Sequence, residues 1–169
     1  MLPLPRPDHF HLQAAFGWLE LENFGQAEVE LTKIRGRFKN HPDVLNVRWH
    51  VASHRKDWQA ALELALTLTQ CYPEVALGWV QLAQSYDALG RTAEACELLK
   101  SVAHSFQNFP LLWYNLACYS AKLGNPQEAF DAFQRANEFG DSNKLTEMAL
   151  ADPDLLPMWD WIRMKGQHC

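Results

Sequence analysis

The sequence predicts an all-α fold built from helix–turn–helix repeats. Alanine recurs every 34 residues, at Ala27, Ala61, Ala95 and Ala129, and a fixed period of this length is typical of a stacked helical array. Three of the four expected second helices are preceded by Asn or Asp, whose short side chain accepts a hydrogen bond from the unpaired amides at a helix start. A bundle of unrelated amphipathic helices would not place a small residue at a constant spacing.

Placing each alanine at the twentieth position of its block divides the chain into four repeats, residues 8–41, 42–75, 76–109 and 110–143. The first helices are expected over residues 9–21, 43–55, 75–89 and 110–123, and the second helices over 24–38, 58–71, 92–106 and 126–139. Residues 1–7 contain three prolines and are expected to form a flexible arm. Residues 144–169 are expected to be a helical cap, since an end repeat has no neighbour to cover its apolar side.

The turns and the helix crossings explain the repeated residues. Gly90 and Gly124 stand where a left-handed residue closes a helix end, and Asn125-Pro126 is the clearest expected cap for a following helix. Alanine is expected where the two helices of a hairpin approach most closely. In the second repeat Trp49 takes the place of the facing alanine, so helix 43–55 is expected to be rotated or splayed, because an indole does not fit in that space.

The third and fourth blocks carry a recognisable pattern. The third reads Trp79-x-x-Leu82-Ala83-x-x-Tyr86 and then Ala95-x-x-x-Leu99, and the fourth reads Trp113-x-x-Leu116-Ala117 and then Ala129-x-x-x-Phe133. Both resemble the tetratricopeptide repeat. The first block is looser, and the second is the most divergent, with Arg48-Trp49 in place of the Leu-Gly pair. The resemblance implies a right-handed superhelix, or α-solenoid, of four such repeats with C-terminal capping helices.

Composition and charge limit the classes of partner that the chain can bind. The chain has 48% hydrophobic and 21% charged residues and a formal net charge of −5, which argues against a nucleic-acid partner, because phosphates require a basic face. The sequence has no apolar run long enough for a membrane span and no basic amphipathic face for a membrane surface. Its four cysteines are scattered, so we expect free thiols and a cytoplasmic location.

No motif for catalysis is present in the sequence. It has no glycine-rich phosphate loop, no nucleophile elbow and no His-Glu-x-x-His. His50 and His54 are four residues apart on one expected helix and have the spacing to share a metal, but no third ligand lies nearby in the sequence. We therefore expect no enzymatic activity, no metal and no cofactor.

The resemblance implies that a concave groove, lined by the first helix of each repeat, binds a protein or peptide segment. The contact residues expected from it are His9, Gln13, Phe16, His50, His54, Gln81, Gln84, Tyr114, Asn115 and Cys118. The corresponding positions lack the cluster of Lys and Arg with which some family members grip a chaperone's terminal carboxylates, and a carboxylate needs such charged donors. A carboxylate clamp is therefore not expected.

The function expected is a non-catalytic scaffold that binds another protein. A small chaperone for a secreted or assembling partner, and a self-associating module that forms a homodimer through the C-terminal cap, are alternatives. The convex face, or the edge around Trp161, is an alternative binding surface. Trp161 lies off the apolar stripe of the cap, and it is expected either to be exposed or to fold down beside Trp159.

Overall fold

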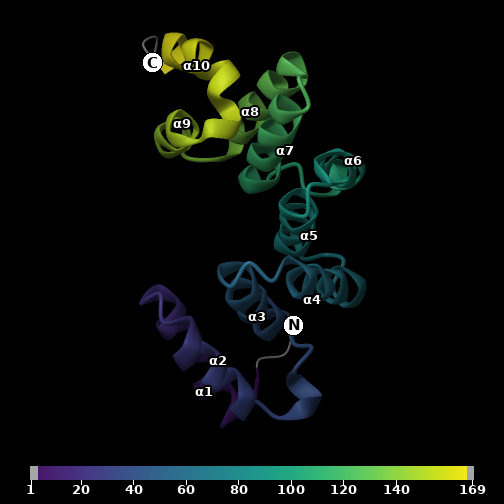
Figure 1. Cartoon of the computed structure of the whole chain (residues 1–169), viewed down its shortest axis with the longest axis vertical. Coiled ribbons are helices and arrows are strands. Elements are labelled where there is room, and N and C mark those ends of the chain that lie inside the picture. The colour runs from purple at the N-terminus through teal and green to yellow at the C-terminus, as the bar shows by residue number, and fades with distance from the viewer. Residues whose placement is uncertain (1–3, 167–169) are drawn as a thin grey trace. The chain divides into compact units, whose positions relative to one another are not determined.

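The computed structural model describes residues 4–166, and within that range it contains only helices and connecting turns (Figure 1). The all-α fold expected from the sequence is confirmed. The chain divides into two compact units, residues 1–85 and residues 86–169. Each unit is considered by itself below.

The first unit contains two helical hairpins and most of a fifth helix. Its elements are α1 (Asp8–Glu20), α2 (Phe24–Lys33), the short 3-10 helix η1 (Gly36–Phe38), α3 (Pro42–His54), α4 (Trp58–Cys71) and α5 (Ala76–Ala88), of which residues through Ser85 belong to this unit. Helix α1 pairs with α2, α3 pairs with α4, and α3 also contacts both α1 and α2 (Figure 1).

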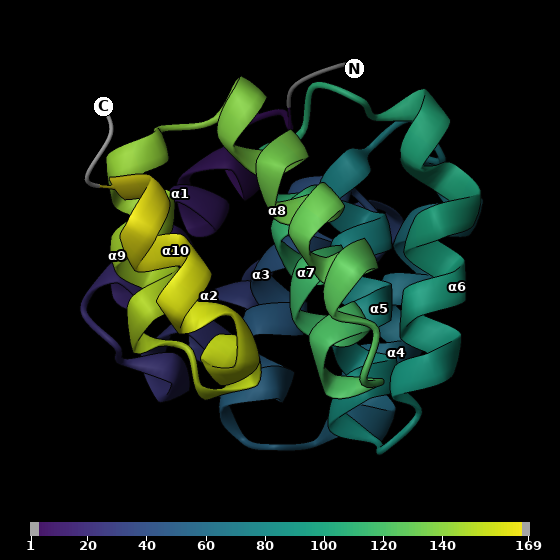
Figure 2. The same cartoon turned by 90° about the horizontal axis from the view of Figure 1, so that it is seen from above.

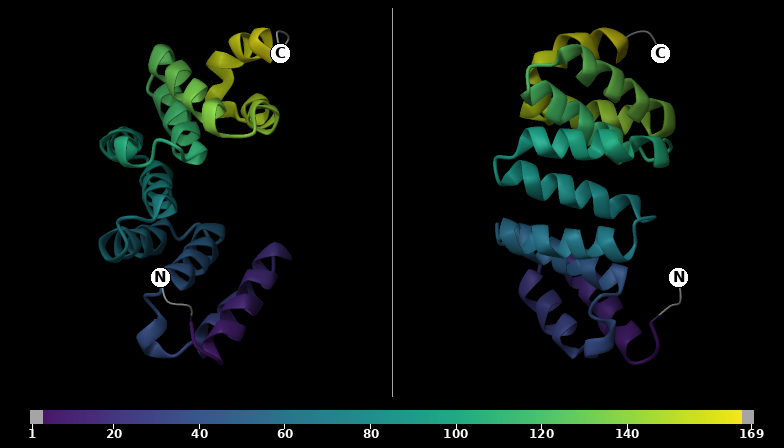
Figure 3. Two further views of the ribbon diagram at one scale, coloured as in Figure 1. Left: turned by 180° about the vertical axis from the view of Figure 1, so that it is seen from behind. Right: turned by 90° about the vertical axis from the view of Figure 1, so that its right-hand side faces the viewer.

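The second unit holds the remaining hairpin and the C-terminal cap. It contains α6 (Thr92–Val102), the 3-10 helix η2 (Ala103–Ser105), α7 (Pro110–Lys122), α8 (Pro126–Phe139), α9 (Ser142–Ala151), the 3-10 helix η3 (Pro153–Met158) and α10 (Trp159–Gly166). Helices α9 and α10 lie side by side (Figure 2), and η3 packs against α7 and α8 (Figure 3).

The small residues at the repeated crossing positions are fully buried. Ala27, Ala61, Ala95 and Ala129 have no exposed surface, and neither has the facing alanine in the first, third and fourth repeats. Gly78 shows a similar close approach, since a Cβ added to it would lie 2.9 Å from Cγ of Leu68. Small side chains at these positions therefore set how closely the helices pack.

All four hairpin turns use a left-handed residue at the fifteenth position of the repeat. Gly90 and Gly124 have φ of 77°, as their type predicted, while Glu22 and Lys56 adopt φ of 54° and 59°. The turn geometry is therefore the same in all four repeats, although only two have the glycine that adopts it without a steric cost.

The helix caps are confirmed at two positions and corrected at a third. The side chain of Asn23 accepts a hydrogen bond from Gln26 N, and that of Asp57 accepts one from Ala60 N. Asn125 was expected to be the clearest cap, but its side chain makes no capping hydrogen bond. Pro126 follows it directly and has no N–H, so this helix start has one fewer amide that needs an acceptor.

The second helix of the first repeat ends earlier than expected. We predicted a helix over residues 24–38, but α2 stops at Lys33 and Ile34 is extended. The cause is Asp8, whose buried carboxylate accepts hydrogen bonds from Arg35 N at 2.8 Å and Arg35 Nε at 2.7 Å. This pairing holds the chain out of the helix and keeps the pKa of Asp8 below its usual value.

The proline-rich arm is not loose where the structure describes it. Leu4 is buried in the core of the first unit together with Leu12, Leu31 and Ile34. The expectation of a flexible segment over residues 1–7 is therefore wrong from Leu4 onward, because this side chain fills an apolar site beside α1. Residues 1–3 lie outside the described part.

Two tryptophans fasten the starts of their helices in the same way. Trp79 Nε1 donates to the carbonyl of Pro73, and Trp113 Nε1 donates to the carbonyl of Gln107, both at 2.8 Å. In each case the acceptor lies six residues before the indole, in the loop that precedes the helix. The two tryptophans, 34 residues apart, thus make the same hydrogen bond from indole to loop carbonyl in successive repeats.

Candidate protein-interaction surfaces

Six of the ten expected contact residues lie on α1, α3 and α5 of the first unit and keep exposed surface. We call this set the inner face: His9, Gln13, Phe16, His50, His54 and Gln84. Gln13 and His54 are exposed, and the others are partly buried. Phe16 packs one side against the first core cluster. None of the six carries a carboxylate, ammonium or guanidinium group, so this face can offer aromatic surface and neutral hydrogen-bonding groups.

The two histidines of α3 face different surroundings. The ring of His54 stacks on Phe24 of α2, with centroids 3.5 Å apart and planes 9° apart, whereas His50 meets Trp49 edge-on at 5.2 Å. Burial lowers the pKa of His50, since the charged imidazolium is poorly solvated there. Among the described residues no group of three or more His, Cys, Asp or Glu side chains is placed to hold a metal ion.

The expected contact residues of the fourth repeat are buried, and two of them are covered by the chain's own cap. Tyr114 and Cys118 are 6% and 5% exposed, and both donate to the carboxylate of Asp152 in the segment that leads into η3, at 3.0 Å and 3.5 Å. Asn115 is buried and donates to the carbonyl of Leu111. These three residues are thus not open lining, and for Tyr114 and Cys118 the reason is that the cap returns onto α7. Burial raises the pKa of both Tyr114 and Cys118.

Gln81 is also not part of an open surface. Its side chain is 1% exposed and its amide nitrogen donates to Asn46 Oδ1 at 2.6 Å, which ties α5 to α3 within the first unit. Gln81 was expected to line an open groove, but this polar side chain is used in packing between helices of the free chain.

Asp152 is the residue whose role in covering the candidate surface of α7 was not predicted from the sequence. Its Oδ1 caps η3 by accepting a hydrogen bond from Asp154 N at 3.0 Å. Its Oδ2 accepts hydrogen bonds from the hydroxyl of Tyr114 and the thiol of Cys118. The signal was the Asp152-Pro153 pair, which marks a helix start. Nothing in the sequence indicated that this start would lie against α7.

The cap buries a continuous apolar set against α7, α8 and α9. Leu155 has no exposed surface, and Met158 and Ile162 are 4% and 2% exposed. Trp161 packs edge-on against Phe130 of α8 with centroids 3.8 Å apart. It therefore folds down onto the last repeat and is only partly exposed, which agrees with the second of the two expectations and not with the first.

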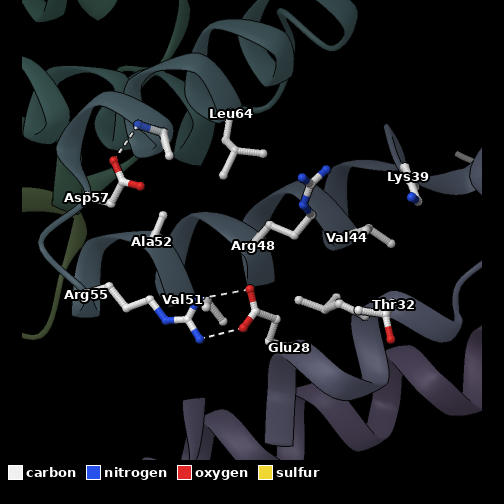
Figure 4. A pocket seen from close by; sticks show the side chains of 12 residues that line it. Glu28, Thr32, Lys39, Val44, Arg48, Val51, Ala52, Arg55, Asp57 and Leu64 are labelled. Carbon is white, nitrogen blue, oxygen red and sulfur yellow. Dashed lines mark hydrogen bonds and ion pairs between the residues drawn. The ribbon is translucent and has the colours of Figure 1, made fainter. Parts of the chain in front are cut away.

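A pocket opens between α2, α3 and α4 of the first unit (Figure 4). It has a volume of about 300 Å³. Its apolar lining comes from Leu31, Val44, Val51, Ala52, Ala60 and Leu64, and its polar lining from Glu28, Thr32, Lys39, Arg48, Arg55 and Asp57. We call it the α2–α4 pocket.

The charges around the α2–α4 pocket are unequally paired. Arg55 and Glu28 form an ion pair through two hydrogen bonds (Figure 4), one of them from Nη1 to Oε1 at 2.9 Å. Asp57 caps α4 through Ala60 N. The side chains of Arg48 and Lys39 make no ion pair or hydrogen bond within the described part of the chain, and the three cations of the lining outnumber its two carboxylates by one.

The pocket is explained by the divergence of the second repeat. Arg48 stands at the seventh position, where the third and fourth repeats have the buried Leu82 and Leu116. Its side chain is exposed and extends along the pocket beside Leu64 and Val44 (Figure 4). Because a polar side chain replaces an apolar one here, the space between the helices is not filled.

Trp49, next to Arg48, is buried but does not rest only on its own hairpin. Its indole Nε1 donates to Ser85 Oγ of α5 at 3.0 Å, and the side chain is 6% exposed. The indole thus finds room toward the following helix of the same unit. The rotation of α3 expected from this residue stays a prediction.

Comparison with known proteins identifies the repeat type. Residues 78–108 and residues 111–139 each match a family model described as a tetratricopeptide repeat. These ranges lie in the two blocks that carry the regular pattern. No curated protein matches the chain.

Solved structures share the fold at low sequence identity. The chain is similar to TTC0263, a thermophilic TPR protein of Thermus thermophilus, with 16% identity, a TM-score of 0.73, and coverage of 94% of this chain and 96% of that chain. It is also similar to MamA, with 16% identity, a TM-score of 0.67, and coverage of 79% and 78%. At these identities the likeness concerns the fold alone. None of the described helices is long and apolar enough to cross a membrane.

Proposed function

The chain belongs to the tetratricopeptide-repeat family, and we propose that it is a non-catalytic adaptor that holds a segment of another protein on the inner face of its first unit. The observation that carries this proposal is the contrast between the two units. The inner face keeps aromatic and amide side chains accessible on α1, α3 and α5, whereas Tyr114 and Cys118 of the fourth repeat are bound by Asp152 of the cap and Asn115 is buried.

The chemistry of the inner face sets the kind of segment it fits. Phe16 offers a partly exposed ring that loses little side-chain entropy on contact. Gln13 can donate to and accept from the backbone of an extended or helical segment. Because none of the six residues carries a carboxylate, ammonium or guanidinium group, affinity should change little with salt concentration.

The test is affinity capture from native lysate followed by mass spectrometry, with matched phenylalanine variants. Phe16→Ala should abolish capture of the partner, whereas Phe139→Ala should retain it, since Phe139 is 44% exposed and lies on α8 of the other unit. Gln13→Ala provides a second variant that removes no buried surface. Equal capture by all three variants would place the partner elsewhere.

An adaptor and a small chaperone would use the same surface. They differ in whether the captured partner is soluble without this chain, which coexpression with and without it measures.

Self-association is a second candidate, favoured by exposed apolar side chains near the cap. Met148 and Leu156 are 40% and 57% exposed, and Phe139 is 44% exposed. Light scattering across a concentration series tests it: a constant monomer mass excludes a homodimer through the cap.

A further inference from the structure

The α2–α4 pocket has the features of a second binding site, distinct from the inner face. Its floor is apolar, being formed by Leu31, Val44 and Leu64 among others, and its volume of about 300 Å³ is at the lower end of the range for ligand sites. It lies between helices of a single unit, so its walls do not depend on the placement of the other unit.

The charge at this pocket is the reverse of the charge of the whole protein. The chain carries a formal net charge of −5, yet the side chains of Arg48 and Lys39 stand at the pocket without an ion pair in the described residues. Glu28, the acidic group that α2 contributes, is already engaged by Arg55 in a two-point ion pair, and Asp57 is engaged in capping α4. The three cations of the lining outnumber its two carboxylates, so an added carboxylate would meet one net positive charge.

We propose that the α2–α4 pocket binds an acidic segment of a partner protein, with an apolar side chain of the segment inserted over Leu31 and Val44 and a flanking carboxylate paired with Arg48. Arginine suits this role because its planar guanidinium can hold a carboxylate through two hydrogen bonds. Lys39 supplies a second, more flexible charge at the η1 side. The occupant is thus defined by an apolar residue next to Asp or Glu.

The position of Arg48 in the repeat supports this assignment. Leucine at the equivalent place fills the interior of the third and fourth repeats, at 3% and 6% exposure. Replacing it with arginine removes a large apolar contact from the hairpin, and the charge gains no partner within the described residues. A bound carboxylate would provide that partner.

A synthetic peptide with leucine between glutamates is the probe, and the same peptide with glutamine in place of glutamate is its control. Binding is measured by fluorescence anisotropy and located by amide chemical-shift changes. The acidic peptide should bind at least about tenfold more tightly than the glutamine peptide at low salt, and this preference should fall as salt rises from about 50 to about 300 mM. The amide shifts should cluster on α2, α3 and η1.

The variant that tests the pocket is Arg48→Leu, which restores the residue of the regular repeats, and Arg48→Gln removes the charge without filling the pocket. Each should lower the affinity for the acidic peptide by about tenfold or more, and Lys39→Gln should lower that affinity severalfold. Lys144→Gln is the matched control, because it changes the net charge equally and lies on α9 of the other unit. Far-UV circular dichroism of each variant confirms that the fold is kept.

Three results would overturn the proposal: equal affinity for both peptides, equal loss in Lys144→Gln and Arg48→Leu, or shifts that map away from the pocket. A change in the oligomeric mass of Arg48→Gln by light scattering would instead make a second copy the occupant and would also overturn it. Phe16→Ala should leave peptide binding at the pocket intact, so failure here is distinguishable from failure of the inner-face proposal.

Discussion

Replacing Leu155 with alanine should loosen the cap from α7. Leu155 has no exposed surface and belongs to η3, which packs on α7 and α8. Removing three buried carbons loses about 2–3 kcal/mol of transfer free energy, and the cavity left behind brings the expected loss to about 3–4 kcal/mol. The melting temperature should fall by about 10 °C if the chain unfolds as one body and by about 20 °C if the second unit unfolds alone.

Leu156 provides the matched control for this experiment. It is the next residue along the chain but is 57% exposed, so Leu156→Ala should change the free energy of unfolding by no more than about 0.5 kcal/mol. Thermal unfolding of the wild type and both variants is followed by far-UV circular dichroism, with tryptophan fluorescence as a second probe. If Leu155→Ala and Leu156→Ala melt together, the cap is a separate appendage and not part of the core of the second unit.

Further predictions concern ionisable side chains. Cys71 is exposed, whereas Cys118 is buried with a raised pKa, so an alkylating reagent at about pH 8 should modify Cys71 much faster, as mass spectrometry of tryptic peptides can show; equal rates would mean that the cap does not cover α7. The pKa of His50 is lowered from 6.5, so the folded state favours neutral imidazole and loses stability as the pH falls below about 6.5; an NMR titration should give a value under 6.5, and His50→Gln should reduce the loss between about pH 7 and pH 5. The hydrogen bond from Arg35 lowers the pKa of Asp8 from 3.8. The ionised carboxylate of Asp8 therefore stabilises the folded state above pH 3.8, and this stabilisation is lost as the pH falls through the pKa of the folded state. Asp8→Asn should therefore flatten the acid end of the stability profile in urea titrations, and an unchanged profile would contradict the role of this pair.

The features that could be predicted from the sequence are those in which the local geometry requires one type of residue. Ala27 and Ala129 mark points where helices touch, because no larger side chain fits there, and Gly90 and Gly124 mark turns that need a left-handed residue. Such requirements act within a few residues or at a fixed repeat position, and so they are visible as a period.

The features that could not be predicted depend on side chains far apart in the sequence. Tyr114 occupies a position that faces the groove in the family, yet it is covered because Asp152, 38 residues later, returns to accept its hydroxyl. The early end of α2 likewise depends on Asp8, 27 residues before Arg35. In both cases a polar pair selects one of several packings that the apolar pattern alone would allow.

The α2–α4 pocket stands between these two cases. The departure at Arg48-Trp49 was visible in the sequence, and its effect on packing was expected for the tryptophan. The sequence does not predict a binding role for the arginine, because an exposed cation on a helix is ordinary. Only the structure shows that it borders an apolar space and that the neighbouring Glu28 is already paired.

The indole hydrogen bonds of Trp79 and Trp113 have a consequence for how such a chain can change length. Donor and acceptor of each bond lie six residues apart in the same loop and helix start, so duplicating or deleting one 34-residue block would copy or remove the whole bond and leave no indole N–H or loop carbonyl unpaired. Each added block would contain its own hydrogen bond between indole and loop carbonyl. What a new block must supply is only a stacking face that matches its neighbours, which makes the regular half of this chain suited to gaining or losing repeats in single steps.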